Sequence, residues 1–412
     1  MTEQAKVPAI RFAGFTDPWE QRKLSEVATF GGGHTPPMAD PDNYEDGYVL
    51  WVTSQDVKSN YLDRTTTQIT EKGAKELTLY PAGSLVMVTR SGILRHTLPV
   101  AELRKPSTVN QDIRVILPQG ECCGEWLLQF FISHNKELLL EFGKTGTTVE
   151  SVDFGKIKDM LLYMPSTVEQ QQIGDFFAKL DSLITLHQRK YDKLVILKKS
   201  MLEKMFPKDG ESVPEIRFAG FTDPWEQRKL EDIANRVTRK NEGESDLPLT
   251  ISSQYGLVDQ RTFFNNQVAS KDMSGYYLLR KGEFAYNKST SGDSPWGAVK
   301  RLVRYEKGCV STLYICFGLD GADPDFLVTY YETDRWYKAV QMIAAEGARN
   351  HGLLNIAPND FFDTALILPP SREEQELIGL FFARLDNHIT LHQRKLELLQ
   401  NIKKSLLDKM FV

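Results

Sequence analysis

The fold is decided by a heptapeptide that the chain contains twice, Ile184-Thr185-Leu186-His187-Gln188-Arg189-Lys190 and, unchanged, Ile389-Thr390-Leu391-His392-Gln393-Arg394-Lys395. Each copy lies in the middle of a longer repeated stretch, Ser166 to Phe206 and Ser371 to Phe411. A proline stands directly before each stretch, as is common at a helix N-terminus. We therefore expect each stretch to form one long helix, the first of which ends at Pro207.

Capping signals and apolar periodicity support the two helices. Ser166 with Glu169, and Ser371 with Glu374, have the spacing of a capping box. Apolar residues recur at heptad spacing in two predicted columns, one with Ile173, Leu180, Leu194 and Met201, the other with Phe176, Leu183 and Leu197. Such a seam needs a partner, and the other copy is the nearest candidate. We interpret the pair as an intramolecular coiled coil; two core helices in separate domains are the alternative.

A second repeat defines the domain organisation. The leading segment Pro8 to Leu24 returns 206 residues later as Pro214 to Leu230, with one change, Ala9 to Glu215. The chain is thus two tandem copies of one unit. The linker between them is short, so that helices that pair would pair antiparallel. The predicted boundaries are 1–165 for the first leading segment and domain, 166–206 for the first helical region, 207–213 for the linker, 214–370 for the second leading segment and domain, and 371–412 for the second helical region.

The variable parts, residues 29–165 and 235–370, are predicted to be strand-rich with a few helices. Expected strands cover 48–52, 84–88, 113–117, 161–164, 283–286, 298–299, 310–317 and 365–368, and expected helices cover 125–141 and 325–345. The predicted fold class is α+β, with two recognition domains separated by a long antiparallel two-helix coiled coil in a pseudo-two-fold repeat. Since the flanks are almost copied while the variable parts diverge, we infer a fixed frame that displays two surfaces. Duplication with drift is the alternative, but drift would also have altered the frame.

Composition restricts the class of protein. The 412 residues include 41% hydrophobic and 25% charged residues, and the formal net charge is −5. No apolar run reaches membrane-spanning length, no signal peptide is evident, and the four cysteines lack metal-ligand spacing. We expect a cytoplasmic protein with reduced thiols and no membrane contact. The negative charge argues mildly against non-specific coating of nucleic acid.

The sequence offers little for catalysis. Gly143-Lys144-Thr145 lacks the upstream glycine of a Walker A motif, and the glycine-rich run from Phe30 to Gly33 opens no helix. No Asn/Asp-Pro-Pro-aromatic motif for amino methylation is present, and the seven histidines form no metal-binding pattern. These observations favour a binding protein over an enzyme.

Three pairs of polar loops at matched places suit DNA. Gln and Arg can form paired hydrogen bonds with adenine and guanine, while Ser, Thr and Lys suit phosphates or base edges. Ordinary polar turns are the alternative for each loop. In the first unit the candidates are Thr53, Ser54 and Gln55; Arg90, Ser91, Arg95 and His96; and Lys144 and Thr147. In the second unit they are Ser252, Ser253, Gln254 and Tyr255; Asn287, Lys288, Ser289, Thr290 and Ser291; and Arg349 and His351.

With these features in place, the whole chain resembles the specificity (S) subunit of type I restriction–modification enzymes. The architecture is the strongest point of resemblance: two target-recognition domains alternate with two helical regions. Local similarities are Gly33-His34-Thr35-Pro36, Asn110-Gln111-Asp112-Ile113, and the helical pattern Gln-Gln-Ile-Gly-Asp-Phe-Phe that begins at Gln171. Thr35 therefore joins the DNA-contact candidates. The second domain lacks the Gly-Gly-x-Thr-Pro feature, so its opening loop cannot be carried over.

The resemblance implies a non-catalytic subunit that binds double-stranded DNA, two methyltransferase (M) subunits and, in the full complex, two restriction (R) subunits. It implies that S-adenosylmethionine is bound by the M subunits, that ATP and Mg are used by the R subunits, and that this chain binds no cofactor. Each recognition domain would read half of a bipartite target, with the helices setting the spacer. A two-headed adaptor for a protein or glycan is the main alternative, and a complete enzyme with an unrecognised site is another.

Overall fold

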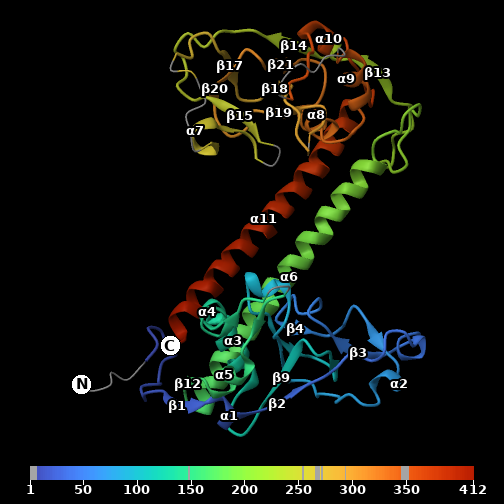
Figure 1. Ribbon diagram of the computed structural model, residues 1–412. Helices are drawn as coiled ribbons and strands as arrows, with labels where there is room; N and C mark the ends of the chain where they lie inside the picture. Colours follow the sequence, from blue (N-terminus) through green and yellow to red (C-terminus); the bar gives the residue numbers. More distant parts are fainter. Residues whose placement is uncertain are drawn as a thin grey trace. The chain divides into compact units, whose positions relative to one another are not determined.

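The computed structural model of the protein describes residues 7–146, 149–252, 255–264, 270, 272–292, 294–344 and 352–412. These residues form two compact units. The first is Met1–Gln188 with Arg394–Val412, and the second is Arg189–Gln393. Each unit contains a leading segment, a domain and parts of both long helices (Figure 1).

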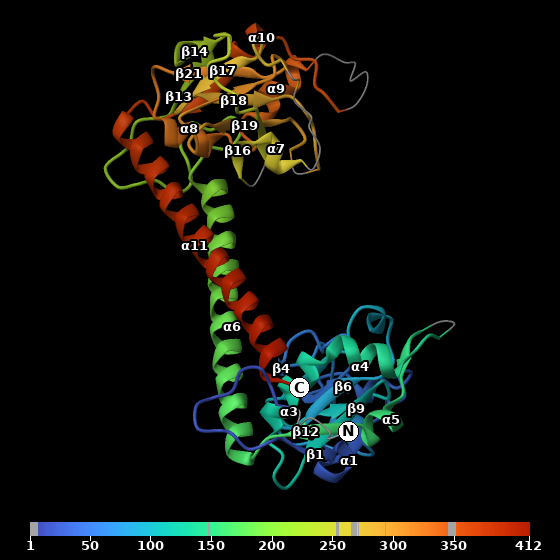
Figure 2. The ribbon, with the colours of Figure 1, turned by 90° about the vertical axis from the view of Figure 1, so that its left-hand side faces the viewer.

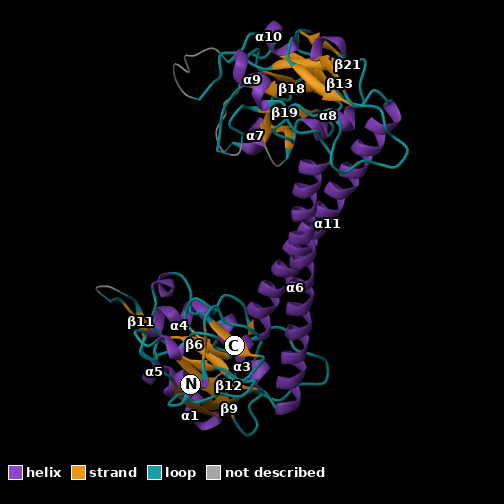
Figure 3. Ribbon diagram, turned by 90° about the vertical axis from the view of Figure 1, so that its right-hand side faces the viewer, coloured by secondary structure: helices purple, strands orange, loops and turns teal. Residues whose placement is uncertain are grey.

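The first unit is built around a five-stranded sheet of order β2-β9-β6-β7-β4. All four residues of its middle strand β6 are buried, because both faces of the sheet are covered. One face packs on α3, where Trp126 is fully buried, and the other packs under β3 and β8. Figure 3 shows α3 and α4 beside the sheet strands β6 and β9.

The elements of the first unit are β1 (Glu20–Lys23), α1 (Leu24–Val27), β2 (Ala28–Gly32), η1 (Pro41–Asn43), β3 (Val49–Val52), β4 (Tyr61–Leu62), β5 (Gln68–Ile69), α2 (Glu71–Ala74), β6 (Leu85–Val88), η2 (Gly92–Arg95), β7 (Val100–Leu103), β8 (Thr108–Val109), β9 (Ile113–Pro118), α3 (Gly124–Ser133), α4 (Asn135–Phe142), β10 (Gly143–Lys144), β11 (Ser151–Val152), α5 (Phe154–Asp159) and β12 (Leu161–Met164). The long helix α6 (Thr167–Lys204) begins in this unit, and the long helix α11 (Arg372–Met410) ends in it.

The second unit repeats this plan with a four-stranded sheet of order β14-β21-β18-β19. One face packs on α8, α9 and α10, and the other packs on strands that include β15, β17 and β20 (Figure 2). Its elements are β13 (Glu226–Lys229), η3 (Leu230–Asp232), β14 (Ala234–Val237), β15 (Leu249–Ser252), β16 (Gly256–Asp259), α7 (Gln260–Phe263), β17 (Tyr277–Arg280), β18 (Phe284–Asn287), β19 (Ala298–Arg301), β20 (Lys307–Val310), β21 (Ile315–Leu319), α8 (Pro324–Tyr330), α9 (Tyr337–Ile343), α10 (Pro358–Phe362) and β22 (Ala365–Leu368).

Three predicted elements are interrupted. The strand expected over 310–317 is split into β20 and β21, because the Ser311 hydroxyl accepts the Leu313 N–H at 3.3 Å and turns the chain. The helix expected over 125–141 breaks at His134, whose ring stacks on Phe130 with centroids 4.3 Å apart. The helix expected over 325–345 becomes α8 and α9, with Trp336 buried at the break. The other expected strands are confirmed within a few residues.

The leading segments pack on the bases of the long helices. β1 pairs with β12 and β13 with β22, both antiparallel. The capping boxes form only in part: the Ser166 and Ser371 hydroxyls accept the Glu169 and Glu374 N–H groups, each at 3.4 Å. The two carboxylates instead bind arginines of the leading segments, because a charged paired bond is stronger than a bond to the cap N–H.

The helical seam was predicted correctly for one column and wrongly, by one residue, for the other. Ile173 and Leu180 are buried, but the second column contains Phe177, with Leu183 and Leu197 left 46% and 41% exposed. In the first unit Phe177 lies 6.1 Å from Phe411 between ring centroids. In the second unit Phe206 and Phe382 repeat this contact at 6.2 Å.

An ion pair accompanies the seam in each unit; it is buried in the first unit and partly exposed in the second. In the first unit Lys403 donates to both Asp181 oxygens at 2.6 and 2.8 Å. In the second unit Lys198 donates to Asp386 at 2.6 Å. Since Phe177 of α6 contacts Phe411, directly after α11, and Asp181 of α6 contacts Lys403 of α11, the helix segments of the first unit run antiparallel.

Candidate nucleic-acid interface

In each unit the leading segment and the long helix, which together we call the frame, are joined by an equivalent buried ion pair. Arg11 donates to both oxygens of Glu169 at 2.8 and 2.7 Å, and Arg217 donates to both oxygens of Glu374 at 2.7 and 2.8 Å. The glutamate side chains are only 1% and 0% exposed. The hydrogen bond from each arginine to its glutamate raises the arginine pKa. The frame therefore holds each domain on its helix in the same way.

The three predicted loops of the first unit meet at one edge of the sheet. The N–H of Asn110 bonds to the Val52 carbonyl at 3.0 Å, beside the first loop. The N–H of Thr89 bonds to the Asp112 carbonyl at 2.8 Å, and the N–H of Val152 bonds to the Thr89 carbonyl at 3.0 Å. The turn at 110–112 therefore connects the first two loops, and the hairpin that carries the third loop bonds to the second.

Some predicted side chains of the first unit build the turns themselves. The Thr53 hydroxyl donates to Asp56 at 2.8 Å, and the Ser91 hydroxyl accepts the N–H of Ile93. Arg95 bonds to Glu150 at 2.5 Å and Lys144 bonds to Asp153 at 2.9 Å, so that both charges are partly balanced. These partners lower the pKa values of the Glu150 and Asp153 carboxyls.

Other predicted side chains of the first unit face solvent. Gln55, Arg90 and His96 are exposed, whereas Ser54 is half-buried. Thr35 donates to the Gln111 side-chain oxygen at 2.5 Å, which places it at the same edge. Thr147 lies outside the described residues. The exposed members are the ones that a ligand could reach.

In the second unit the second loop contacts the residues that directly follow the predicted third loop. The Thr290 N–H and hydroxyl donate to the Gly352 carbonyl at 2.6 and 3.0 Å. The N–H of Leu354 donates to the Lys288 carbonyl at 3.0 Å, and Ser289 forms a β-bridge with Leu353. In both units the second loop therefore contacts the residues that follow the predicted third loop.

The predicted residues of the second unit divide in the same way. Asn287 accepts the Ser289 N–H at 3.1 Å, and Lys288 donates to the Ile356 carbonyl at 3.2 Å while burial lowers its pKa. Ser252 is buried and accepts the Tyr255 N–H at 3.2 Å, so that its hydroxyl shapes the turn. Tyr255, Ser289 and Ser291 are exposed. Ser253, Gln254, Arg349 and His351 lie outside the described residues.

The stretch Asn110-Gln111-Asp112-Ile113, noted in the sequence only as a local similarity, forms a turn that bonds to the first two loops. The turn Asn110–Asp112 follows β8, and its counterpart Ser311–Leu313 follows β20. Asn110 accepts the Asp112 N–H at 3.1 Å, just as Ser311 accepts the Leu313 N–H. An Asn or Ser two residues before such an N–H is a turn signal that the sequence does contain.

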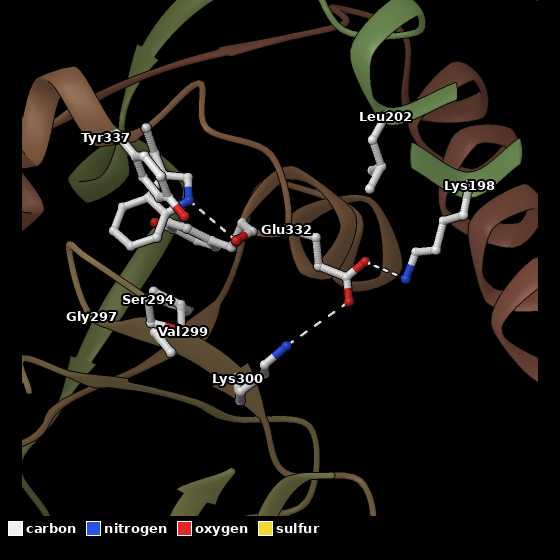
Figure 4. Close-up of a pocket in the computed structure, with 11 residues that line it drawn as sticks. Lys198, Leu202, Ser294, Gly297, Val299, Lys300, Glu332 and Tyr337 are labelled. Carbon is white, nitrogen blue, oxygen red and sulfur yellow. Dashed lines mark hydrogen bonds and ion pairs between the residues drawn. The ribbon is translucent and has the colours of Figure 1, made fainter. Parts of the chain in front are cut away.

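A polar pocket joins α6 to the recognition domain within the second unit (Figure 4). Lys198 bonds to Glu332 at 2.7 Å, and Lys300 of β19 lies 3.9 Å from the other Glu332 oxygen. Trp336 and Tyr337 line the opposite wall of this cavity of about 300 Å³. Lys198 also holds Asp386, so that one ammonium group ties α6 to α11 and to the turn after α8. We interpret this cluster as an anchor of the domain on its helices.

The described residues also bear on metal binding, thiol chemistry and membrane insertion. No group of three or more His, Cys, Asp or Glu side chains there is arranged to hold a metal ion. The four cysteines are free, and burial raises the pKa of Cys122 and Cys316 to about 12. Neither long helix, nor any other helix over the described residues, is apolar enough to cross a membrane.

Comparison with known proteins shows which class the chain resembles. Residues 16–195 match the family of type I restriction modification DNA specificity domains. The chain is 29% identical over 186 residues to the specificity subunit of the Escherichia coli type I restriction enzymes EcoR124I and EcoR124II. This match covers 42% of the chain and 46% of that protein, and so spans less than half the length of that relative.

Two further comparisons extend over almost the whole chain. The MjaIX type I specificity subunit of Methanocaldococcus jannaschii is 24% identical over an alignment of 419 positions, which covers 95% of this chain and 92% of that one. The crystal structure of the type I S subunit from M. genitalium matches with a TM-score of 0.58 and 11% identity, covering 99% of each chain. The resemblance to specificity subunits is confirmed, and the fold is shared along the chain.

Proposed function

We propose that this chain is the specificity subunit of a type I restriction–modification complex. Each recognition domain reads one half of a bipartite double-stranded DNA target, and the two long helices form a continuous antiparallel coiled coil that sets the spacer. M subunits that carry S-adenosylmethionine methylate adenine at N6, and R subunits that use ATP and Mg cleave unmodified DNA. The chain itself contributes no catalytic group and acts in the cytoplasm.

The observation that carries this proposal is that the contacts between leading segment and long helices repeat in both units, while the loops at the edge of the sheet differ in sequence. The ion pairs Arg11–Glu169 and Arg217–Glu374 and the seam contacts recur almost unchanged. The loops at the sheet edge differ in sequence but meet in the same way. A frame of this kind suits two readers of different sequences, and the match of residues 16–195 to DNA specificity domains supports DNA as the ligand.

Exposed apolar residues on the frame support docking of two M subunits. Leu186 and Leu391 occupy the same place in the repeated heptapeptide and are 47% and 46% exposed. Two identical partners need two such like surfaces. In the second unit, Phe218 and the α11 residues Leu377, Leu380 and Phe381 also line an apolar groove of about 280 Å³. Burial of these side chains by a partner would be favourable.

The proposal is tested by mapping N6-methyladenine across the genome of a host that carries the M subunits, with and without this chain. We expect a methylated motif of two defined blocks and a fixed gap that depends on the chain. Methylation that does not depend on the chain would overturn the proposal. The alternative hypothesis, a two-headed adaptor that binds another ligand, would then be the one to test.

The spacer role has its own test in the repeated heptapeptide. Deleting residues 184–190 and 389–395 together removes one heptad from each helix and keeps the seam in register. The helices shorten by roughly 10 Å, and we expect the gap to shorten by about three base pairs. Deleting four residues from each helix instead breaks the seam, and we expect that variant to lose methylation. An unchanged gap in the heptad variant would exclude the helices as the ruler.

A further inference from the structure

We infer that Asp181 of α6 is a positioning residue that sets the angle of the first recognition domain on its helix, and that this angle, together with the helix length, sets the gap between the two halves of the target. This inference rests on the proposed function and deepens it, because the proposed function assigns the gap to the long helices alone. Asp181 is given no contact with DNA and acts only through the placement of the domain.

The first recognition domain meets α6 at one point near the start of the helix. The Gln170 side-chain oxygen accepts the N–H of Cys123, directly before α3, at 2.9 Å. A Cβ atom at Gly174 would come within 3.0 Å of Glu125 Cβ, so that α3 and α6 lie very close together there. The apolar contacts around this point are non-directional and tolerate a small tilt. A single point of this kind fixes the domain on the helix but leaves its angle open.

Asp181 provides a second point of attachment, roughly 10 Å farther along α6 than Gly174. Its carboxylate accepts the Asn60 amide at 2.9 Å and the Gln129 amide at 3.3 Å. Lys403 of α11 donates to both of its oxygens, at 2.6 and 2.8 Å. One carboxylate that is only 8% exposed therefore joins the recognition domain to both long helices. Two points separated along the helix define an angle.

The recognition domain presents the two amides from well-fixed elements. Asn60 directly precedes β4, and its carbonyl accepts the N–H of Glu102 in β7 at 2.8 Å. Gln129 lies in α3 and is fully buried. Because hydrogen bonds depend on distance and angle, and a buried amide without a partner is costly, a tilt of the domain away from Asp181 is opposed.

The second unit attaches its domain by different chemistry at the same place of the repeat. Asp386 is the counterpart of Asp181, and Lys198 donates to it at 2.6 Å. Lys198 also bonds to Glu332 of the recognition domain at 2.7 Å, so that one ammonium group replaces the two amides (Figure 4). The helix carboxylate is common to both units, whereas the partner from the domain differs. Each domain therefore supplies the groups that decide how it sits on the helix.

The inference is tested with the full chain in complex with its M subunits. DNA duplexes carry the two blocks of the mapped motif at the wild-type gap, one base pair closer and one base pair farther apart, and the rate of N6-adenine methylation is measured for each. We expect Asn60→Ala combined with Gln129→Met to lower the preference for the wild-type gap by about tenfold or more, because two hydrogen bonds to a charged group are lost. The bases required in each block should stay the same.

Thr97→Val is the matched control for a general loss of stability. The Thr97 hydroxyl donates to the Asn135 side chain at 3.0 Å within the same recognition domain. Its removal should lower the temperature of unfolding without changing the preference for the gap. Asn60→Ala alone keeps the buried Gln129 and should lower the preference by a smaller factor. This single variant decides the question if the double variant does not fold.

The outcomes separate this inference from the proposed function. A wild-type chain that directs no methylated motif overturns the proposed function itself. A gap preference that stays at the wild-type value in the Asn60 variants overturns the role of Asp181 and leaves the helix length as the ruler. A loss of gap preference in Thr97→Val as large as in the Asn60 variants also overturns it, because lowered stability would then be the cause.

Discussion

At the scale of single residues, the stability of each unit depends on a carboxylate that is sealed from water. Glu374 is 0% exposed and is neutralised by Arg217, which is 11% exposed. Arg217→Ala would leave a buried charge without its partner. We expect a loss of about 3–5 kcal/mol in the free energy of unfolding, measured by urea unfolding of the full chain.

Arg22 offers the matched control for this prediction. It pairs with Glu20 on the surface, with side chains 48% and 75% exposed. Arg22→Ala should therefore cost no more than about 1 kcal/mol. Replacing both Arg217 and Glu374 by methionine removes the two charges together and should recover much of the loss. Equal unfolding midpoints for Arg217→Ala and Arg22→Ala would contradict the role of the buried pair.

Glu102 gives a pH dependence whose sign can be stated. Burial, with the neighbouring Glu125, raises its pKa to about 7 from the ordinary 4.5. The folded state therefore holds a proton that the unfolded state releases between pH 4.5 and 7. The protonated Glu102 side chain contributes to the stability of the folded state below pH 4.5, and this contribution is lost as the pH rises to 7. Relative to Glu102→Gln, the wild type should lose roughly 1–3 kcal/mol of its free energy of unfolding between pH 4.5 and 7. Stability curves that stay parallel for the two proteins over this pH range would contradict the prediction.

The same scale explains why only part of the candidate site could be predicted. Polar loops after strands are visible in the sequence, and in the second unit the second loop contacts the residues that follow the predicted third loop. The stretch Asn110-Gln111-Asp112-Ile113 was noted in the sequence, but its backbone bonds to Val52 and Thr89, which are distant in sequence, could not be predicted from it. The hydroxyls of Thr53 and Ser252 form hydrogen bonds within their own turns. The residue types alone do not show whether such a hydroxyl bonds within the turn or faces a ligand.

At the scale of elements, the long helices were predictable and the second column of their seam was not. The pair of phenylalanines at 176 and 177 allows two choices of column, and packing against Phe411 selects Phe177. The broken helix at His134 and the split strand at Ser311 depend on single local contacts in the same way. Periodicity in the sequence predicts that a helix or strand is present, whereas tertiary contacts determine which of its faces is buried and where it ends.

The corrected seam predicts a sharp difference between two apolar positions of α6. Phe177 is fully buried, whereas Leu183 is 46% exposed. Phe177→Ala should cost about 3–5 kcal/mol, because it leaves a cavity where α6 meets α11. Leu183→Ala should cost less than about 1 kcal/mol in the isolated chain. Thermal unfolding of the two variants compares them directly, and a larger loss for Leu183→Ala would restore the original column.

At the scale of the whole molecule, the two repeats are closed in the same way at their ends. The N–H of Ile216 bonds to the Lys204 carbonyl at 2.9 Å, and the short linker connects these residues. The N–H of Ile10 bonds to the Lys409 carbonyl at 3.0 Å, although no linker joins them. Trp19 meets Phe411 as Trp225 meets Phe206, with ring centroids 6.5 and 5.7 Å apart. The order of the two repeats along the chain is therefore not fixed by their packing.

A circular permutant tests this equivalence. Residues 214–412 are followed by a copy of residues 208–213 and then by residues 8–207, so that both repeats keep their contacts. We expect its free energy of unfolding to lie within about 1 kcal/mol of the wild type, because one short loop has been exchanged for another.

The control permutant has the same new linker but opens between Val86 and Met87, in the buried middle strand of the first sheet. It should not fold, because the cut exposes a strand that is covered on both faces. Circular dichroism and thermal unfolding distinguish the two permutants. Failure of the first permutant would show that Ile10 and Lys409 depend on the natural order of the repeats, and that the likeness of the two closures is not sufficient to hold the first unit together.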